Sequence, residues 1–234
     1  MGNIAIGPGI LTPTPAVAGT PEAAIAKRVY ARANPAVVTI RGNDGWGSGF
    51  IISGNYIVTN AHVVKGQPAV VTVMMADGKT EIPADLVGFA KGGIDLALLK
   101  INRRIKLPTV QLGNVKSISV GDSVYAIGTP LAEVNQNTFT SGMVSALRND
   151  GRRIQHNAAI NRGNSGGPLL NDRGEVIGVN TSGSLSQVID EKGKIVAIGT
   201  GSVGIGYAIG ADVVRQFLTD AKQGKISPVA TINR

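Results

Sequence analysis

The sequence contains no cysteine and only two histidines among its 234 residues. Without cysteine, a disulfide framework, a thiol nucleophile and a cysteine-ligated zinc or iron–sulfur site are all excluded. The two histidines stand 94 residues apart in the chain (156 − 62) and make a poor ligand set, so we expect no metal and no other cofactor. No run of about 18 apolar residues occurs, so the sequence predicts no membrane span.

Aromatic residues are also scarce, at 4%, whereas glycine is abundant, with 32 residues. This combination indicates many tight turns between short strands. The 43% of hydrophobic residues and the 16% of charged residues are the balance of a folded chain. The net charge of +8 is spread without a basic cluster of five, and the aromatic residues are scattered. We therefore expect no nucleic-acid partner.

The two ends of the chain differ from its middle. Residues 1–20 are rich in Gly, Pro, Ala and Thr, and we interpret them as a flexible arm without an intact signal peptide. Thr20-Pro21-Glu22 predicts a helix start, and Asn34-Pro35 predicts its end. Residues 210–224 change to helical period and predict a C-terminal helix. The predicted units are 21–112, with the N-terminal helix, then 113–224, with the C-terminal helix, and a tail, 225–234.

Between the helices, short β-rich segments occur in two sets, one on each side of residues 102–120, which we interpret as a crossover. A dozen short strands predict an all-β fold made of two small barrels. The expected strands are Ala36–Arg41, Gly49–Ile52, Tyr56–Thr59, Ala69–Met75, Glu81–Phe89 and Asp95–Ile101, then Ser123–Ile127, Asn137–Leu147, Arg153–Ala159, Glu175–Asn180, Lys194–Ile198 and Gly206–Ile209.

The segment Gly163–Leu169 carries the clearest chemical signal, because three glycines surround Ser165. Such a loop can aim the N–H groups of Gly163 and Ser165 at a developing oxyanion. A serine hydroxyl needs a neighbouring base, and only two histidines are available. His62 ends an apolar strand, and we take it as the base. His156 stands in a predicted strand nine residues before the serine, and we interpret it as a solvated strand residue.

A histidine base needs a carboxylate that holds its tautomer. Asp95 opens the apolar segment Asp95–Ile101, and a carboxylate at the start of a buried strand costs free energy unless it is paired. Asp85 and Asp122 are weaker candidates, because their contexts are typical of surface or turn residues. We therefore predict that Asp95 orients His62.

The order His62, Asp95, Ser165, within TNAHVV, DLALLK and GNSGGPL, resembles the trypsin-fold serine proteases, and most closely the HtrA/DegP branch. Segments 46–50, 158–161 and 204–209 are similar again, so the resemblance covers roughly residues 22–223, a protease domain without a PDZ domain. It implies two six-stranded antiparallel β-barrels. It also implies Ser165 as nucleophile, His62 as general base and then acid, and Asp95 as the orienting carboxylate. Asn164 lies between the two oxyanion-hole residues Gly163 and Ser165.

Two departures from the trypsins affect activation and specificity. Asn164 replaces the acid that pairs with a freed N-terminus, so we expect no activating cut. Ala159 stands where the trypsin pocket has its aspartate, so the pocket should reject Lys and Arg and accept small aliphatic P1 side chains. The expected substrate pocket consists of Ile160, Asn161, Thr181, Ser182, Gly183, Ile205, Gly206 and Tyr207. Segment 182–203, with a hairpin turn at 190–193, is either a gate beside this pocket or a surface hairpin.

The resemblance implies an extracytoplasmic serine endopeptidase, periplasmic or secreted, that cleaves unfolded or extended polypeptides. A dedicated processing protease and a catalytically resting, chaperone-like binder are the alternatives. Members of the family form trimers through the N-terminal segment, so residues 1–34 have two interpretations. They either build a homotrimer or include a helix that packs on its own barrel.

Overall fold

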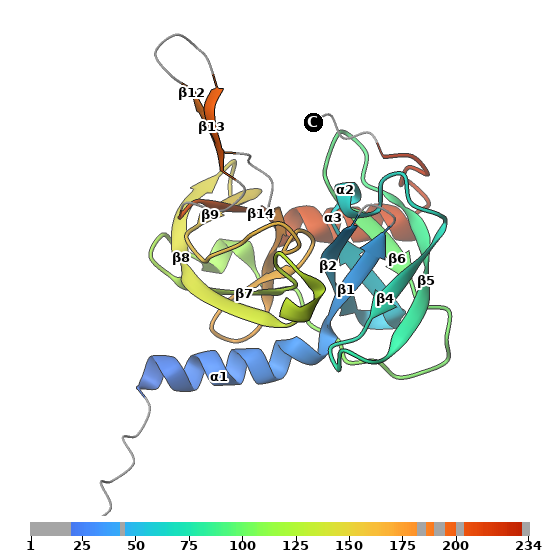
Figure 1. The fold of residues 1–234 in the computed structure, drawn as a ribbon, viewed down its shortest axis with the longest axis horizontal. Helices are drawn as coiled ribbons and strands as arrows, with labels where there is room; N and C mark the ends of the chain where they lie inside the picture. Colours follow the sequence, from blue (N-terminus) through green and yellow to red (C-terminus); the bar gives the residue numbers. More distant parts are fainter. Residues whose placement is uncertain (1–19, 43–44, 182–185, 190–194, 200–203, 231–234) are drawn as a thin grey trace, which may run out of the picture.

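The computed structural model describes residues 20–42, 45–181, 186–189, 195–199 and 204–230. Two closed β-barrels stand side by side and hold most of the strands (Figure 1). The first barrel has the order β1-β2-β3-β6-β5-β4, and neighbouring strands pair antiparallel. Its strands are β1 Val37–Gly42, β2 Gly45–Ile52, β3 Tyr56–Thr59, β4 Val70–Met74, β5 Glu81–Phe89 and β6 Ala97–Lys100.

The second barrel has the order β10-β11-β14-β9-β8-β7, again with antiparallel neighbours. The prediction of two six-stranded antiparallel barrels is therefore confirmed. The strands of this barrel are β7 Ser123–Gly128, β8 Thr138–Arg148, β9 Arg153–His156, β10 Pro168–Leu170, β11 Val176–Thr181 and β14 Gly206–Gly210.

Two details of the second barrel differ from the sequence prediction. The expected strand Lys194–Ile198 is not a barrel strand: β13 Ile195–Gly199 pairs with β12 Ser186–Ile189 in a separate two-stranded sheet. The missing barrel strand is β10, which follows Gly166-Gly167 directly and begins at a proline. Proline lacks an N–H but is tolerated at the first residue of a strand. Because Gly-Gly-Pro is typical of a turn, the sequence pattern does not indicate this short strand. The expected turn 190–193 lies outside the described residues.

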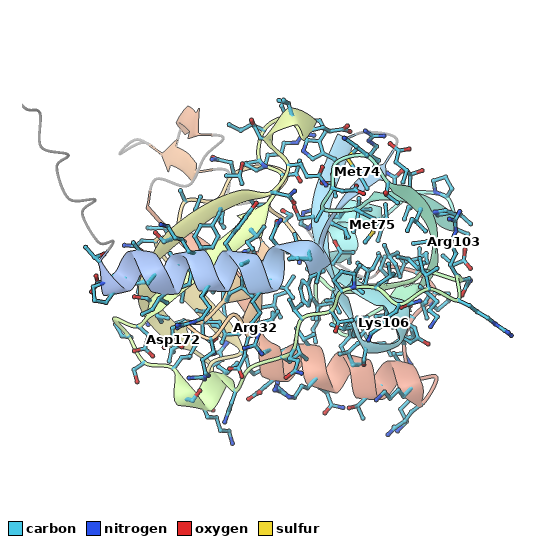
Figure 2. All side chains as sticks on the ribbon, turned by 90° about the horizontal axis from the view of Figure 1, so that it is seen from below. Arg32, Met74, Met75, Arg103, Lys106 and Asp172 are labelled. Atoms are coloured by element: carbon cyan, nitrogen blue, oxygen red, sulfur yellow. The ribbon has the colours of Figure 1, made fainter. Side chains whose placement is uncertain are left out.

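Helices lie at both ends of the described chain, and both were predicted. Helix α1, Pro21–Ala33, begins where Thr20 Oγ1 accepts a hydrogen bond from the Ala23 N–H (3.2 Å). Its Tyr30 meets Phe139 of the second barrel edge to face, with ring centroids 5.4 Å apart. Arg32, labelled in Figure 2, lies beside Gly174 in the turn between β10 and β11 of the same barrel. Helix α3, Ala211–Lys222, buries Val214 and Phe217. No helix within the described ranges is long and apolar enough to cross a membrane.

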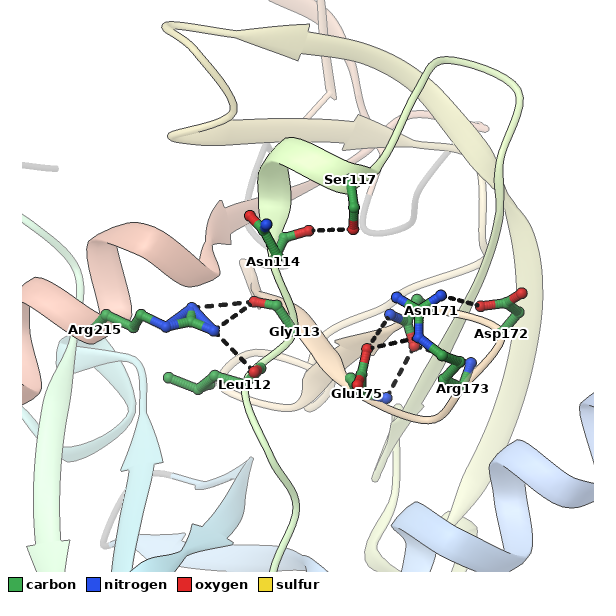
Figure 3. Close-up of polar contacts among 9 residues, drawn as sticks. All are labelled: Leu112, Gly113, Asn114, Ser117, Asn171, Asp172, Arg173, Glu175 and Arg215. Atoms are coloured by element: carbon green, nitrogen blue, oxygen red, sulfur yellow. Dashed lines mark hydrogen bonds and ion pairs between the residues drawn. The ribbon is translucent and has the colours of Figure 1, made fainter.

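The linker between the barrels is fastened to the second barrel and to α3 (Figure 3). The Arg215 guanidinium donates hydrogen bonds to the Leu112 carbonyl (2.8 Å) and the Gly113 carbonyl (2.9 and 3.1 Å). The Gly113 N–H donates to the Val176 carbonyl (2.8 Å), at the start of β11. These contacts fix the point where the chain passes from one barrel to the other, so residues of both barrels can share one site.

Candidate active site

His62 is carried by a single helical turn that follows a strand of the first barrel. Strand β3 ends at Thr59, and the turn α2, Ala61–Val64, buries Ala61 and Val64 against the barrel. Val63 packs against the backbone of Gly47, where any Cβ would come within 2.6 Å of its methyl groups. The imidazole is thereby presented at the barrel rim, with its side chain 20% exposed.

Asp95 holds His62 through two contacts. The carboxylate Oδ2 lies 2.7 Å from His62 Nδ1, and Oδ1 accepts a hydrogen bond from the His62 backbone N–H at 2.9 Å. The Asn60 side chain also donates to the Asp95 carbonyl (2.8 Å). With Nδ1 facing the carboxylate, Nε2 is the nitrogen left to exchange a proton with a nucleophile. Asp95 is separated from β6 by one residue, Leu96, so it lies in the loop before the strand rather than in the expected strand.

The two weaker carboxylate candidates lie elsewhere and make local contacts. Asp85 is on β5 and accepts a hydrogen bond from the Asn102 amide. Asp122 is exposed and accepts a hydrogen bond from the Ser119 N–H (2.8 Å). Neither of these contacts involves a histidine.

The loop with Ser165 is fastened to both barrels. The Ser165 carbonyl accepts a hydrogen bond from the Ser48 N–H of β2 (2.8 Å). Asn180 of β11 accepts from the Gly166 N–H and donates its own N–H to the Gly167 carbonyl, both at 2.9 Å. Ser165 itself is 4% exposed. The loop thus sits between β2 of one barrel and β11 of the other.

Gly166 makes this close approach sterically feasible. It has φ +84°, and a Cβ at this position would lie 2.2 Å from both the Ser48 carbonyl oxygen and Thr59 Oγ1. It would also lie 3.0 Å from the Asn60 N–H nitrogen, two residues before His62. Only glycine meets both the positive φ and the contact distance. The loop that carries Ser165 therefore packs directly against the segment that carries His62.

Gly163 lies in a turn, and a hydrogen bond from a residue outside the turn fixes the orientation of the Arg162–Gly163 peptide. Its φ of +101° and the hydrogen bond from the Asn164 N–H to the Asn161 carbonyl (2.9 Å) define a type II turn. The Arg162 carbonyl accepts a hydrogen bond from the Leu131 N–H (2.8 Å). Because C=O and N–H point in opposite directions across a trans peptide, the Gly163 N–H is directed away from Leu131.

Segment 129–137, which contains Leu131, is anchored on the first barrel. The Arg41 guanidinium of β1 binds both carboxylate oxygens of Glu133, at 2.7 to 3.0 Å. This pairing raises the pKa of Arg41. Gln136 donates to the Met75 carbonyl (2.8 Å) and Asn137 to the Ala76 carbonyl (2.6 Å). A partly exposed ion pair adds little stability, so its main consequence here is the position of the segment.

The expected pocket residues fall into three groups. Thr181 and Tyr207 are register partners on β11 and β14, and Gly206 precedes Tyr207. Ile160 is buried and Asn161 partly exposed on the stretch that leads to the serine loop, whereas Ile205 is 49% exposed. Ser182 and Gly183 lie outside the described residues. The described members therefore come from the 160–161 stretch, from the paired strands β11 and β14, and from Ile205, which directly precedes β14.

The interpretation of His156 as a solvated residue is wrong. The side chain is 0% exposed and points into the second barrel, because on β9 it shares the inward face with buried Ile154. Burial lowers the pKa of His156 to about 4, and hydrogen-bonding contributions of Asn180 and of the Ala158 backbone oppose this only in part. The two-residue spacing from the apolar Ile154 is the sequence signal that indicates an inward-facing His156.

The site has a histidine and a carboxylate on one barrel and a glycine-rich serine loop on the other, in a double-barrel fold. The family model of the trypsin-like peptidase domain matches residues 47–179, and the chain belongs to this family.

Relatives of the chain fall in the HtrA/DegP branch of that family. The chain is 40% identical to the periplasmic pH-dependent serine endoprotease DegQ of Escherichia coli over 181 residues, which are 74% of this chain and 36% of DegQ. It is 36% identical to the serine protease HTRA4 of Mus musculus over 199 residues, 80% of this chain and 37% of that protein. The chain thus spans only about a third of the curated relatives that it matches.

A solved structure resembles the chain in three dimensions. The HtrA-type protease AlgW with a tripeptide superimposes with a TM-score of 0.69 at 34% sequence identity. The match covers 85% of this chain and 64% of AlgW. The order of strands and the positions of both barrels are therefore those of an established protease architecture.

Proposed function

We propose that this chain is a serine endopeptidase in which Ser165 is the nucleophile, His62 the general base and Asp95 the orienting carboxylate. The observation that carries the proposal is the double contact of Asp95 with His62, at 2.7 and 2.9 Å, beside the tightly seated serine loop. A binding protein has no need for a carboxylate that is partly withdrawn from solvent and fixes one imidazole nitrogen. The resting, chaperone-like alternative is therefore less well supported.

In the proposed reaction, His62 Nε2 takes the proton of Ser165 Oγ as this oxygen attacks the peptide carbonyl. The resulting oxyanion is stabilised by the N–H groups of Gly163 and Ser165, on either side of Asn164. His62 then donates its proton to the amine leaving group, and the acyl-enzyme remains. Water attacks the ester with His62 again as base, which releases the acid product and restores Ser165.

The type II turn supports the oxyanion-hole assignment. The Leu131 N–H donates a hydrogen bond to the Arg162 carbonyl, so this carbonyl points toward residue 131 and the Gly163 N–H points to the opposite side. The Gly163 carbonyl accepts a hydrogen bond from the Ser48 hydroxyl (2.7 Å), which fixes the orientation of the Gly163–Asn164 peptide as well. Donors that are oriented before the substrate arrives need no reorganisation during the reaction.

We further propose a small aliphatic P1 residue and extended polypeptides as substrates. The pocket side chains that are described are uncharged, and Ile205 is an exposed apolar side chain among them. An extended chain would bind by main-chain hydrogen bonds in the manner of an added strand. The periplasmic location named for DegQ supports an extracytoplasmic compartment for this chain. The packing of α1 on its own second barrel favours a structural role of residues 21–33 over a homotrimer contact.

The proposal is tested by incubating an unfolded protein such as casein with the wild type and with Ser165→Ala at neutral pH. We expect cleavage by the wild type alone, and mass spectrometry should place most cuts after Val, Ala or Ile. A preference for cuts after Arg or Lys would contradict the pocket assignment. Cleavage by both proteins, at equal rates, would contradict the assignment of Ser165.

A further inference from the structure

His156 is a buried histidine that the proposed reaction does not use. Its ring nitrogens Nδ1 and Nε2 have no hydrogen-bond partner among the described residues, and the same is true of Asn180 Oδ1. Asn180 is near enough to affect the protonation of the imidazole, yet no hydrogen bond of good geometry joins them. Burial of unsatisfied polar atoms costs free energy that an apolar side chain of the same size would avoid. Such costs are typical of functional positions.

The imidazole lies beside β14, the strand that pairs with β11, and β11 in turn carries the residue that binds the serine loop. A Cβ on Gly206 of β14 would come within 2.5 Å of His156 Cε1, so the ring fills the space beside this glycine. Asn180, on β11, binds three consecutive residues after the nucleophile. Its backbone binds Gly166 and Gly167, and its side-chain amide donates to the Pro168 carbonyl at 3.0 Å.

We propose that His156 is a positioning residue: its uncharged imidazole keeps Asn180, and through it residues 166–168, in the arrangement that places Ser165, and a charged imidazole releases them. The role in catalysis rests on the proposed nucleophile, whereas the release of the loop can be observed without catalysis.

No charged side chain in the described barrel is placed to stabilise a charged His156. Strands β11 and β14 contain no charged residue, and Val144 of β8 is the register partner of His156. Arg153 of β9 stacks outside the barrel on Tyr207, with 4.0 Å from its Cζ atom to the ring centroid, and Arg148 of β8 is exposed. Asn180 and the Ala158 backbone are the polar neighbours.

The direction of the pH effect follows from this environment. The pKa of His156 is lowered to about 4 from the ordinary value of 6.5. Above pH 6.5 the imidazole is neutral in both folded and unfolded chains, and stability does not depend on it. As the pH falls from 6.5 toward 4, the unfolded or released form binds the proton first, so the native arrangement loses stability.

The first test compares His156→Leu with Ile154→Val at neutral pH, because both change inward-facing residues of β9. For His156→Leu we expect a higher Tm, since the unsatisfied ring nitrogens are removed, together with a kcat at least tenfold lower and a KM within threefold of the wild type. For Ile154→Val we expect a lower Tm and an unchanged kcat. His156→Leu with full kcat would overturn the proposal, and so would a kcat loss that only follows a lower Tm.

The second test needs no catalytic activity. Trp46 is the only tryptophan, and its Nε1 donates to the Thr129 carbonyl (2.9 Å) next to Gly163, so its fluorescence reports on the serine loop. In a His62→Gln background, where His156 is the sole histidine, we expect an emission change between pH 6 and pH 4 with constant far-UV circular dichroism. Adding His156→Leu should abolish it. An unchanged transition in that double variant, or none in the His62→Gln protein down to pH 3.5, would overturn the proposal.

Discussion

Replacing Asp95 by asparagine is expected to lower kcat by about 10⁴, the size of effect known for the carboxylate of Ser-His-Asp triads. The geometry gives the reason. Asp95 Oδ1 accepts a hydrogen bond from the His62 backbone N–H (2.9 Å), so the amide oxygen of the asparagine must take that place. Its NH₂ group then faces Nδ1, which becomes an acceptor. The proton moves to Nε2, and the imidazole cannot accept the Ser165 proton.

The measurement is kcat on a peptide with a small aliphatic P1 residue, with Asp122→Asn as matched control. The Asp122 side chain also accepts a hydrogen bond from a backbone N–H, that of Ser119 (2.8 Å). Its side chain has no contact with a histidine among the described residues, so Asp122→Asn should keep the wild-type kcat. Both variants should retain the wild-type far-UV spectrum. An Asp95→Asn protein with kcat within tenfold of the wild type would show that another group orients His62.

Replacing Gly166 by alanine is expected to lower kcat/KM by more than 10² and Tm by roughly 10 °C. The added Cβ would lie 2.2 Å from the Ser48 carbonyl oxygen and from Thr59 Oγ1, and φ is +84°. The loop must therefore withdraw from the segment that carries His62, and Ser165 moves with it. A clash and strain of about 3 kcal/mol or more correspond to that change in Tm for a chain of this size.

The matched control is Gly121→Ala, because Gly121 has φ +96° but nothing within 4 Å of an added Cβ. It introduces the same kind of backbone strain without the clash, and costs about 1 kcal/mol. We expect a Tm only a few degrees lower and an unchanged kcat/KM. If both glycine variants behaved alike in activity, close packing of the serine loop on the first barrel would not be what places Ser165.

The sequence predicted those features of the fold and the site that depend on local residue patterns. Alternating apolar residues revealed most strands, and Thr20-Pro21 and Asn34-Pro35 marked both ends of α1. His62 and Asp95, taken as partners from their contexts, are in contact in the structure. The roles of these residues and of Ser165 stay predictions until the variants are measured.

The features that the sequence did not reveal depend on contacts between distant segments. Strand β10 is three residues long and exists because β7 and β11 pair with it on either side. The Leu131 N–H reaches the Arg162 carbonyl because Arg41, from the first barrel, anchors Glu133. No local pattern encodes such long-range hydrogen bonds. The burial of His156, by contrast, could have been predicted from the alternation of inward-facing and outward-facing residues in β9.

The most direct test of the proposed nucleophile is covalent labelling with an alkyl fluorophosphonate, which forms a serine phosphonate ester and releases fluoride. Intact mass and peptide mapping should show one label per native chain, on Ser165. Labelling should be absent from the urea-unfolded chain and from Ser165→Ala, and strongly slowed in His62→Gln. A label on another serine, or undiminished labelling of Ser165→Ala, would contradict the active site proposed for this double barrel.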